Sequence, residues 1–148
     1  DSYSADRTLD IIAAYPQAKV IPHQFESFAN QCNFGLSQIQ SEWVLSLDAD
    51  YILSQELIDE IESLSDLTDI DGYIVPFKYC VFGKPLRGTL YPSRKVLYRT
   101  NKGVYENDGH AHRVTIDGAI GSLVNCIHHD DRKPLSRWLW AQDRYMVI

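Results

Sequence analysis

The stretch Trp43-Val44-Leu45-Ser46-Leu47-Asp48-Ala49-Asp50 decides the fold. Its apolar, partly β-branched first half predicts a buried strand. The two carboxylates follow at the carboxyl end of that strand, where open α/β sheets bind their ligands. Paired carboxylates suit Mg²⁺ or Mn²⁺ on a diphosphate better than Zn²⁺, which prefers nitrogen and sulfur. An exposed acidic turn that caps the next helix remains the alternative, because the D-x-D spacing of Asp48 and Asp50 is a weak pattern by itself.

Helices and strands alternate along the first half of the chain. Apolar residues at helical spacing predict a helix that ends before Pro16, a second over residues 28–40, and a third that Ser54 caps. Short apolar strands at residues 19–21 and 43–47 separate them, and this order implies right-handed crossovers and a parallel sheet. After Gly72 the pattern is strand-rich and predicts a mixed sheet, followed by a helix from Leu135; the expected strands are residues 73–83, 95–99 and 113–117.

Length and composition limit the function classes. With 148 residues the chain is one domain or part of one, and its net charge of −6 makes nucleic acid an unsuitable partner. The sequence has no apolar run that could cross a membrane and no signal-peptide pattern. Three widely spaced cysteines, with no C-x-x-C pair, favour a reducing cytoplasm. Because the chain opens on Asp1 and stops inside a predicted helix, we expect a piece of a longer protein, cut at both ends.

Charge is unevenly distributed along the chain. Residues 20–77 contain eleven Asp and Glu but no Lys or Arg, whereas residues 78–113 contain eight basic and two acidic residues. An acidic part that holds a metal and a basic part that holds an anion is what a metal–diphosphate site needs. Two differently charged, solvated faces are the alternative.

Three blocks of sequence together resemble family 2 glycosyltransferases, in the branch that includes lipopolysaccharide-core glucosyltransferases. They are DSYSADRT at residues 1–8, QCNFGL at residues 31–36 and EWVLSLDAD at residues 42–50. The resemblance implies the GT-A fold, an αβα sandwich with a mixed, mostly parallel sheet, here truncated at its N-terminus. It implies a single partial domain, in which residues 1–71 bind a nucleotide sugar and residues 72–148 hold the acceptor and catalytic part with a C-terminal helix.

The resemblance also implies roles for individual residues at the donor site. Asp1 matches the acid that hydrogen-bonds the donor's base, usually uracil. Asp48 matches the first acid of the D-x-D motif, near the ribose or the metal, and Asp50 matches the second, which binds Mn²⁺ or Mg²⁺ on the diphosphate. Asn33 stands where the family has a donor-site Asn, and an ordinary amide on a helix surface is its alternative.

An inverting transfer needs a general base that takes the proton of the acceptor hydroxyl. Asp108 is the first choice, since Asn107-Asp108 stands where the family has an acidic dipeptide, and His110 is the second because imidazole titrates near neutrality. The alternative is a simple turn, since Asp-Gly is a common turn dipeptide.

The last cluster is His128-His129-Asp130-Asp131-Arg132-Lys133. His129 resembles the late histidine that completes the metal shell in many GT-A enzymes, and Arg132 and Lys133 are expected to contact the diphosphate. Alternatively the two acids cap the following helix. That helix is rich in Trp and Arg; we expect it to pack on the sheet, and a peripheral contact with a membrane surface is the alternative.

The sequence therefore favours a cytoplasmic, metal-dependent inverting glycosyltransferase. Its expected donor is a UDP-sugar and its expected acceptor a saccharide or lipid-linked saccharide of the bacterial envelope, at the inner face of the plasma membrane. Two alternatives remain open: a metal-dependent phosphoester hydrolase, and a catalytically silent module that binds nucleotide sugars.

Overall fold

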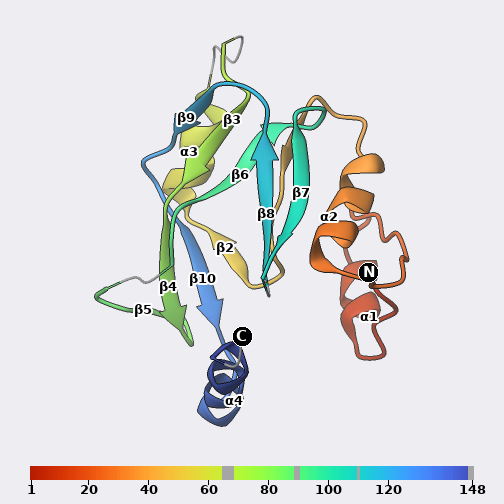
Figure 1. Ribbon diagram of the computed structural model, residues 1–148, viewed down its shortest axis with the longest axis vertical. Coiled ribbons are helices and arrows are strands. Elements are labelled where there is room, and N and C mark those ends of the chain that lie inside the picture. Colours follow the sequence, from red (N-terminus) through yellow and green to blue (C-terminus); the bar gives the residue numbers. More distant parts are fainter. Residues whose placement is uncertain (65–68, 89–90, 110, 147–148) are drawn as a thin grey trace. The chain divides into compact units, whose positions relative to one another are not determined.

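The protein has a mixed α/β fold, shown in Figure 1. The computed structural model describes residues 1–64, 69–88, 91–109 and 111–146. Two compact units make up the chain, one of residues 1–38 and 105–113 and the other of residues 39–104 and 114–148. The functional division at residue 71 stays a prediction.

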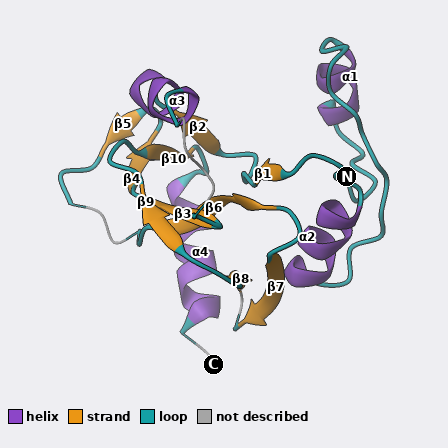
Figure 2. Cartoon of the chain, turned by 90° about the horizontal axis from the view of Figure 1, so that it is seen from above, coloured by secondary structure: helices purple, strands orange, loops and turns teal. Residues whose placement is uncertain are grey.

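The first unit contains two helices, α1 (Thr8–Ala13) and α2 (Phe28–Ser37), both visible in Figure 2. Ser27 starts α2, because its hydroxyl accepts a hydrogen bond of 3.1 Å from the N–H of Asn30. The strand predicted at residues 19–21 is wrong. The main chain there bonds to Asp1 instead: the Asp1 amino group donates to the Ile21 carbonyl, and the Asp1 carbonyl accepts from the N–H of His23.

The second unit is built on two four-stranded sheets. The first has the order β1 (Trp43–Leu45), β6 (Arg94–Arg99), β3 (Gly72–Val75) and β9 (Ile120–Ser122). The second has the order β2 (Tyr51–Leu53), β10 (Ile127–Asp131), β4 (Phe77–Val81) and β5 (Lys84–Pro85). The described residues also form a two-stranded sheet of β7 (Gly103–Asp108) and β8 (Ala111–Ile116), of which residues 105–113 belong to the first unit.

The expected mixed sheet is confirmed, but the expectation that it is mostly parallel is wrong. In the two larger sheets of the described chain, β3 pairs with β9 and β4 with β10 in parallel, while the other four neighbouring pairs are antiparallel. Parallel neighbours need a crossover of a dozen or more residues. Of the four antiparallel pairs, β4 and β5 are joined by a short turn, whereas the strands of the other three pairs lie far apart in the sequence.

Helix α3 (Gln55–Glu62) covers the core of the second unit. The Ser54 hydroxyl accepts from the N–H of Leu57 at 3.2 Å, so the predicted cap is confirmed. Leu57 is fully buried against apolar side chains from β3, β4, β6 and β10, and in Figure 1 the helix lies beside β3. This core fixes the positions of β2 and β10, the strands on which the candidate site is built.

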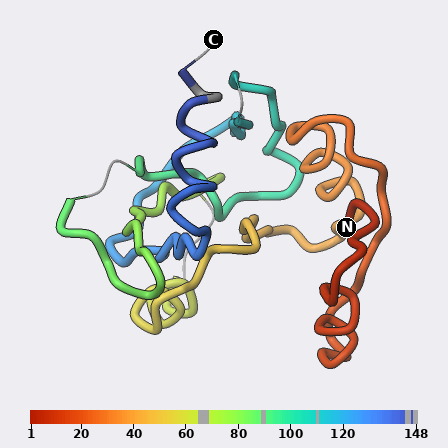
Figure 3. The backbone as a smooth tube through the Cα atoms, turned by 90° about the horizontal axis from the view of Figure 1, so that it is seen from below, coloured from red at the N-terminus to blue at the C-terminus, as the bar shows by residue number. Residues whose placement is uncertain are grey.

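The last helix, α4 (Leu135–Tyr145), follows β10 after a short turn, as Figure 3 shows. All residues from 135 to 140 are exposed, so the first half of this helix is not buried on the sheet. It does contact the sheet through the side chain of Trp138, which hydrogen-bonds the hydroxyl of Tyr79 on β4. None of the described helices combines the length and apolar character needed to span a bilayer.

Candidate functional site

The D-x-D motif forms the turn that carries the chain from one sheet to the other. Asp48 lies three residues after β1, and its carbonyl accepts a hydrogen bond of 3.0 Å from the N–H of Tyr51, the first residue of β2. Asp48 is exposed to solvent. The side chain of Asp50 is 38% exposed. The motif thus leaves Asp50 half-sheltered beside the second sheet.

Strand β10 brings the late histidine to this turn. It runs antiparallel to β2 with His129 opposite Tyr51, and the N–H of Asp130 donates to the Asp50 carbonyl at 3.0 Å. The two side chains expected to share a metal are therefore adjacent: Nε2 of His129 lies 3.1 Å from Oδ2 of Asp50. Residues 79 positions apart in the sequence meet because two strands pair.

Three tyrosine rings surround the imidazole of His129. Their centroids lie 4.6 Å (Tyr91), 5.0 Å (Tyr79) and 5.5 Å (Tyr51) from that of the imidazole. The hydroxyls of Tyr51 and Tyr91 are 2.8 Å apart. Burial raises the pKa of all three tyrosines, that of Tyr79 to about 12 with help from its bond to Asp131, so they are neutral phenols at pH 7. The cage fixes the imidazole, and its Nδ1 atom is buried with no hydrogen-bond partner in the described structure.

Two acids at the end of β10 are buried. Asp131 accepts from the Tyr79 hydroxyl at 2.7 Å and from the N–H of Lys133 at 2.9 Å. Burial alone would raise the pKa of Asp131, but these two bonds outweigh it and hold that pKa below its usual range. Neither acid caps the following helix: α4 begins at Leu135, and its N-cap residue Pro134 makes no side-chain hydrogen bond, so that alternative is wrong.

Asp130 is the more deeply buried of the two, with 3% of its side chain exposed. It accepts from the N–H of Gly83 at 2.6 Å and from Nε of Arg132 at 2.7 Å. The bond from Gly83, followed by that from Arg132, lowers the pKa of Asp130. Both acids are therefore anions near neutral pH, each held by two donors.

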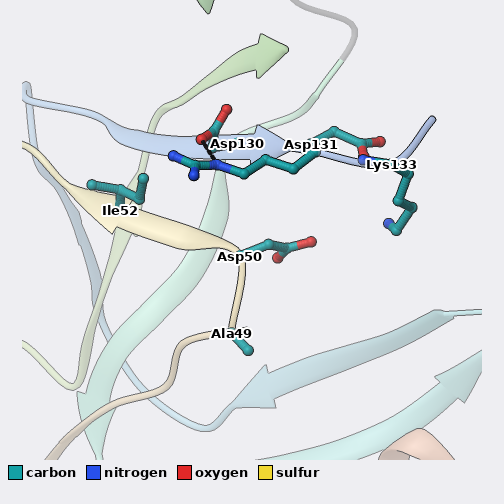
Figure 4. A pocket seen from close by; sticks show the side chains of 7 residues that line it. Ala49, Asp50, Ile52, Asp130, Asp131 and Lys133 are labelled. Atoms are coloured by element: carbon teal, nitrogen blue, oxygen red, sulfur yellow. Dashed lines mark hydrogen bonds and ion pairs between the residues drawn. The ribbon is translucent and has the colours of Figure 1, made fainter. Parts of the chain in front are cut away.

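A pocket of about 470 Å³ opens over this region. Figure 4 shows Asp50 at the start of β2 and, across from it, the end of β10 with Asp130, Asp131 and Lys133. Arg132 offsets the charge of Asp130, and Lys133 lies next to Asp131 and donates to it through its main-chain N–H. The pocket thus offers N–H donors of Arg132 and Lys133 beside the Asp50 carboxylate; its lining is formed by Ala49, Asp50, Ile52, Asp130, Asp131, Arg132 and Lys133.

Asp50 and His129 form a pair that fits a shared cation site. Two ligands at right angles, each about 2.1 Å from one ion, lie about 3 Å apart, close to the 3.1 Å between Oδ2 and Nε2. Within the described ranges no three metal-binding side chains gather at one point. The Asp50 carboxylate suits Mg²⁺ or Mn²⁺, which take few protein ligands and fill their shells with water and substrate phosphate, whereas the imidazole of His129 is a ligand that transition metals accept more readily than Mg²⁺.

The remaining predicted residues belong to the first unit. The carboxylate of Asp1 accepts from the N–H and the hydroxyl of Ser4, at 2.9 and 2.6 Å. The side-chain amide of Asn33 donates to the carbonyl of Tyr105 and accepts from its N–H, at 2.9 and 2.8 Å, so it holds β7 to α2. The donor-binding roles of Asp1 and Asn33 stay predictions.

The two candidate bases differ in what the structure describes. Asp108 is 53% exposed and pairs with Arg113 at 2.6 Å. His110 lies outside the described residues. The structure thus brings Asp50 together with His129, Arg132 and Lys133 in one unit, with Asp48 in the same turn, while Asp1, Asn33 and Asp108 are in the other.

Comparison with known proteins identifies the family. The sequence pattern of "Glycosyl transferase family 2" matches residues 1–114, which is more than three quarters of the chain. The chain belongs to glycosyl transferase family 2. Similar curated proteins include an "Uncharacterized glycosyltransferase" of Rickettsia bellii, 38% identical over 74 residues, and "Uncharacterized glycosyltransferase RT0209" of Rickettsia typhi, 40% identical over 74 residues. Each alignment covers 50% of this chain, and the chain spans about 25% of the length of either relative.

The match of this family 2 chain ends before β10. The positions of His129, Arg132 and Lys133 beside the motif therefore rest on the structure rather than on the family pattern. Sequence reasoning missed the tyrosine cage and the strand β10 itself, because His-His-Asp-Asp lacks the apolar alternation that signals a strand. The available signal was the spacing of His129 and Asp131, since residues two apart on one strand share a face.

Proposed function

We propose that this chain carries the donor-binding part of an inverting glycosyltransferase. It moves a sugar from a nucleoside-diphosphate sugar, a UDP-sugar, to a saccharide or lipid-linked saccharide of the bacterial envelope. The observation that carries the proposal is the separation of 3.1 Å between Asp50 and His129 in a pocket lined by Arg132 and Lys133. Membership of family 2 supports the class of reaction.

The chain's own residues would divide the work as follows. Asp50 and His129 would hold Mn²⁺ or Mg²⁺, with Asp48 near the ribose or the metal, and Arg132 and Lys133 would contact the diphosphate. When bound, the cation supplies Lewis-acid stabilisation of the negative charge on the departing diphosphate. The tyrosine cage keeps the imidazole in one orientation, and Asp1 and Asn33 would contact the rest of the donor.

Asp108 is the proposed general base. The acceptor hydroxyl attacks the anomeric carbon, its proton passes to the Asp108 carboxylate, and the electron pair of the broken C–O bond leaves with the nucleoside diphosphate. Arg113, at 2.6 Å, would orient the carboxylate before the acceptor arrives. His110 is the second candidate for the same proton transfer.

Donor hydrolysis by the complete protein tests the donor site. We expect turnover of at least one sugar from a panel of UDP-, GDP- and dTDP-sugars with Mn²⁺ or Mg²⁺, and loss of turnover with EDTA. His129→Gln is expected to reduce turnover at least tenfold, whereas Thr115→Ser, an exposed position on β8, should change it less than twofold. Full turnover in EDTA removes the metal role, and wild-type turnover in His129→Gln removes His129 from the site.

A pair of Asp→Asn variants tests the base. Asp108→Asn should lower the rate of sugar transfer about 100-fold or more while leaving the affinity for the donor unchanged. Asp117→Asn changes another exposed acid and should leave both quantities unchanged. Full transfer by Asp108→Asn moves the assignment to His110, which His110→Gln then tests.

The first half of α4 would place this enzyme at the cytoplasmic face of the plasma membrane. Exposed Leu135, Leu139 and Trp140 give it an apolar surface, and Lys133 and Arg137 beside them match the charge of anionic lipid.

Flotation of the complete protein tests this membrane contact. We expect the protein to float with vesicles containing phosphatidylglycerol and to sediment with neutral ones. Leu139→Asp should abolish flotation, whereas Val124→Asp, at a site 84% exposed outside the helix, should not. Absence of flotation by the unchanged protein refutes the membrane contact.

A further inference from the structure

Asp130 is an unusual acid for a pocket proposed to bind phosphate. Only 3% of its side chain is exposed, and a buried carboxylate is costly unless donors compensate its charge. Gly83 supplies one donor through its N–H, and Arg132 supplies the other through Nε. Both oxygens are thus engaged, so the carboxylate cannot rotate toward a ligand.

The donor from Gly83 is fixed by the turn between β4 and β5. Phe82 and Gly83 have φ angles of 48° and 77°, in the left-handed region that glycine adopts without strain. This turn aims the Gly83 N–H at Oδ1 of Asp130 at 2.6 Å. One oxygen of the carboxylate is therefore held by the main chain, independently of Arg132.

Arg132 has the opposite environment. Its side chain is 71% exposed and lines the pocket, and the structure records one partner for its guanidinium among the described residues, the Asp130 carboxylate. The bond uses Nε, and a guanidinium carries five N–H donors in a rigid fork. The four N–H groups on the two terminal nitrogens stay available for a second anion.

We infer that Asp130 is a positioning residue, which holds Arg132 by Nε at the wall of the pocket so that its terminal nitrogens meet the oxygens of a nucleoside diphosphate. The inference rests on the proposed function and deepens it. An exposed arginine samples many rotamers, and anchoring one end reduces the freedom that it loses on binding. The Asp130–Arg132 unit is nearly neutral, so it selects phosphate by the geometry of its donors rather than by net charge.

A double-mutant cycle on the complete protein separates this role from a structural one. The measurement is the dissociation constant of UDP, GDP or dTDP, whichever binds best, with Mn²⁺ present. Arg132→Ala should weaken binding about tenfold, and Asp130→Asn, which keeps the acceptor for Gly83, about three- to tenfold. Adding Asp130→Asn to Arg132→Ala should change affinity less than twofold. The KM for the donor should rise in Asp130→Asn, with a smaller change in kcat.

Asp71→Asn is the matched control. Asp71 also accepts from a backbone N–H, that of Ala119, and lies 3.6 Å from an arginine Nε, that of Arg99, but it does not line the pocket. It should lower the melting temperature without changing nucleotide affinity.

Several outcomes overturn the assignment. If Asp130→Asn lowers nucleotide affinity equally in the wild-type background and in Arg132→Ala, Asp130 acts through the fold. If Asp130→Asn binds the nucleotide more tightly than wild type, Asp130 repels the anion. If Asp130→Asn does not fold, Arg132→Lys decides: a lysine lacks the fork, so wild-type affinity in that variant refutes the inference. A wild-type protein that binds none of the three nucleotides refutes the proposed function, and this inference with it.

Discussion

The hydrogen bond between Tyr79 and Asp131 links the tyrosine cage to the end of β10, and Tyr79→Phe removes it. The hydroxyl donates to Oδ2 of Asp131 at 2.7 Å and also receives a hydrogen bond from Trp138 of α4. The substitution keeps the ring that packs on His129 and leaves a buried carboxylate with one donor fewer. It therefore tests whether this polar contact, rather than aromatic packing, stabilises the site.

The magnitude follows from the type of bond. A hydrogen bond to a charged group contributes about 1.5–3 kcal/mol, and a neutral one about 0.5–1.5 kcal/mol. Trp138 is 39% exposed, so water replaces most of its contribution. We expect Tyr79→Phe to lower the free energy of unfolding by about 2 kcal/mol at pH 7, most of it from Asp131.

The pH dependence gives this prediction a second, independent measure. The pKa of Asp131 is lower in the folded protein than in the unfolded chain, so its charge stabilises the fold above the unfolded pKa. That stabilisation is lost as the pH falls below about 4 toward the folded pKa. The difference between wild type and Tyr79→Phe should therefore shrink as the pH is lowered from 7 to about 3.5.

Urea unfolding of the two proteins across this pH range measures both effects. Tyr73→Phe is the control, because Tyr73 is also buried and the described structure records no hydrogen bond of its hydroxyl. Its free energy of unfolding should fall by less than about 0.5 kcal/mol. The hydrogen bond between Tyr79 and Asp131 is contradicted if Tyr79→Phe lowers the free energy of unfolding no more than the control does at pH 7. It is also contradicted if this decrease is the same at every pH.

Other substitutions test the framework that holds the site. Glu60→Gln should lower the free energy of unfolding by about 1–3 kcal/mol in a urea titration, because the Glu60 carboxylate accepts from the N–H groups of Val124 and Asn125 and from the Asn125 amide. Gly118→Ala should lower the melting temperature by several degrees, since φ is 141° and an added Cβ would lie 1.9 Å from the Asp71 carboxylate. Leu57→Ala should cost about 2–5 kcal/mol in the same titration, because this side chain is fully buried in the core.

Matched substitutions at open positions check that these effects are local. Gly35→Ala, inside α2, meets no atom within 4 Å and should raise stability by about 0.5–1 kcal/mol. Glu62→Gln changes an exposed acid on the same helix as Glu60 and should be neutral. If Gly35→Ala or Glu62→Gln lowers stability as much as Gly118→Ala or Glu60→Gln, the contacts assigned to Gly118 and Glu60 are contradicted.

The local structure of the chain was predictable where neighbours in the sequence determine it. The serine cap of α3, the apolar face of α2 and α3, the strand before the D-x-D motif, and β3, β4, β6 and β8 follow from patterns within a few residues, whereas β7, β9 and β10 were not predicted. The prediction failed at residues 19–21, because a strand needs a partner and the main chain there bonds to Asp1 instead.

The sequence by itself determined the family, the acidic turn at Asp48 and Asp50, and the type of side chain available for a cation and a diphosphate. Only the tertiary structure decided that the main-chain pairing of β10 with β2 brings His129 to Asp50, that Asp130 holds Arg132 instead of capping α4, and that α4 is exposed at its start. The reason is physical. Caps and apolar periodicity are contacts between residues near in the chain, whereas strand partners and burial depend on contacts between segments dozens of residues apart.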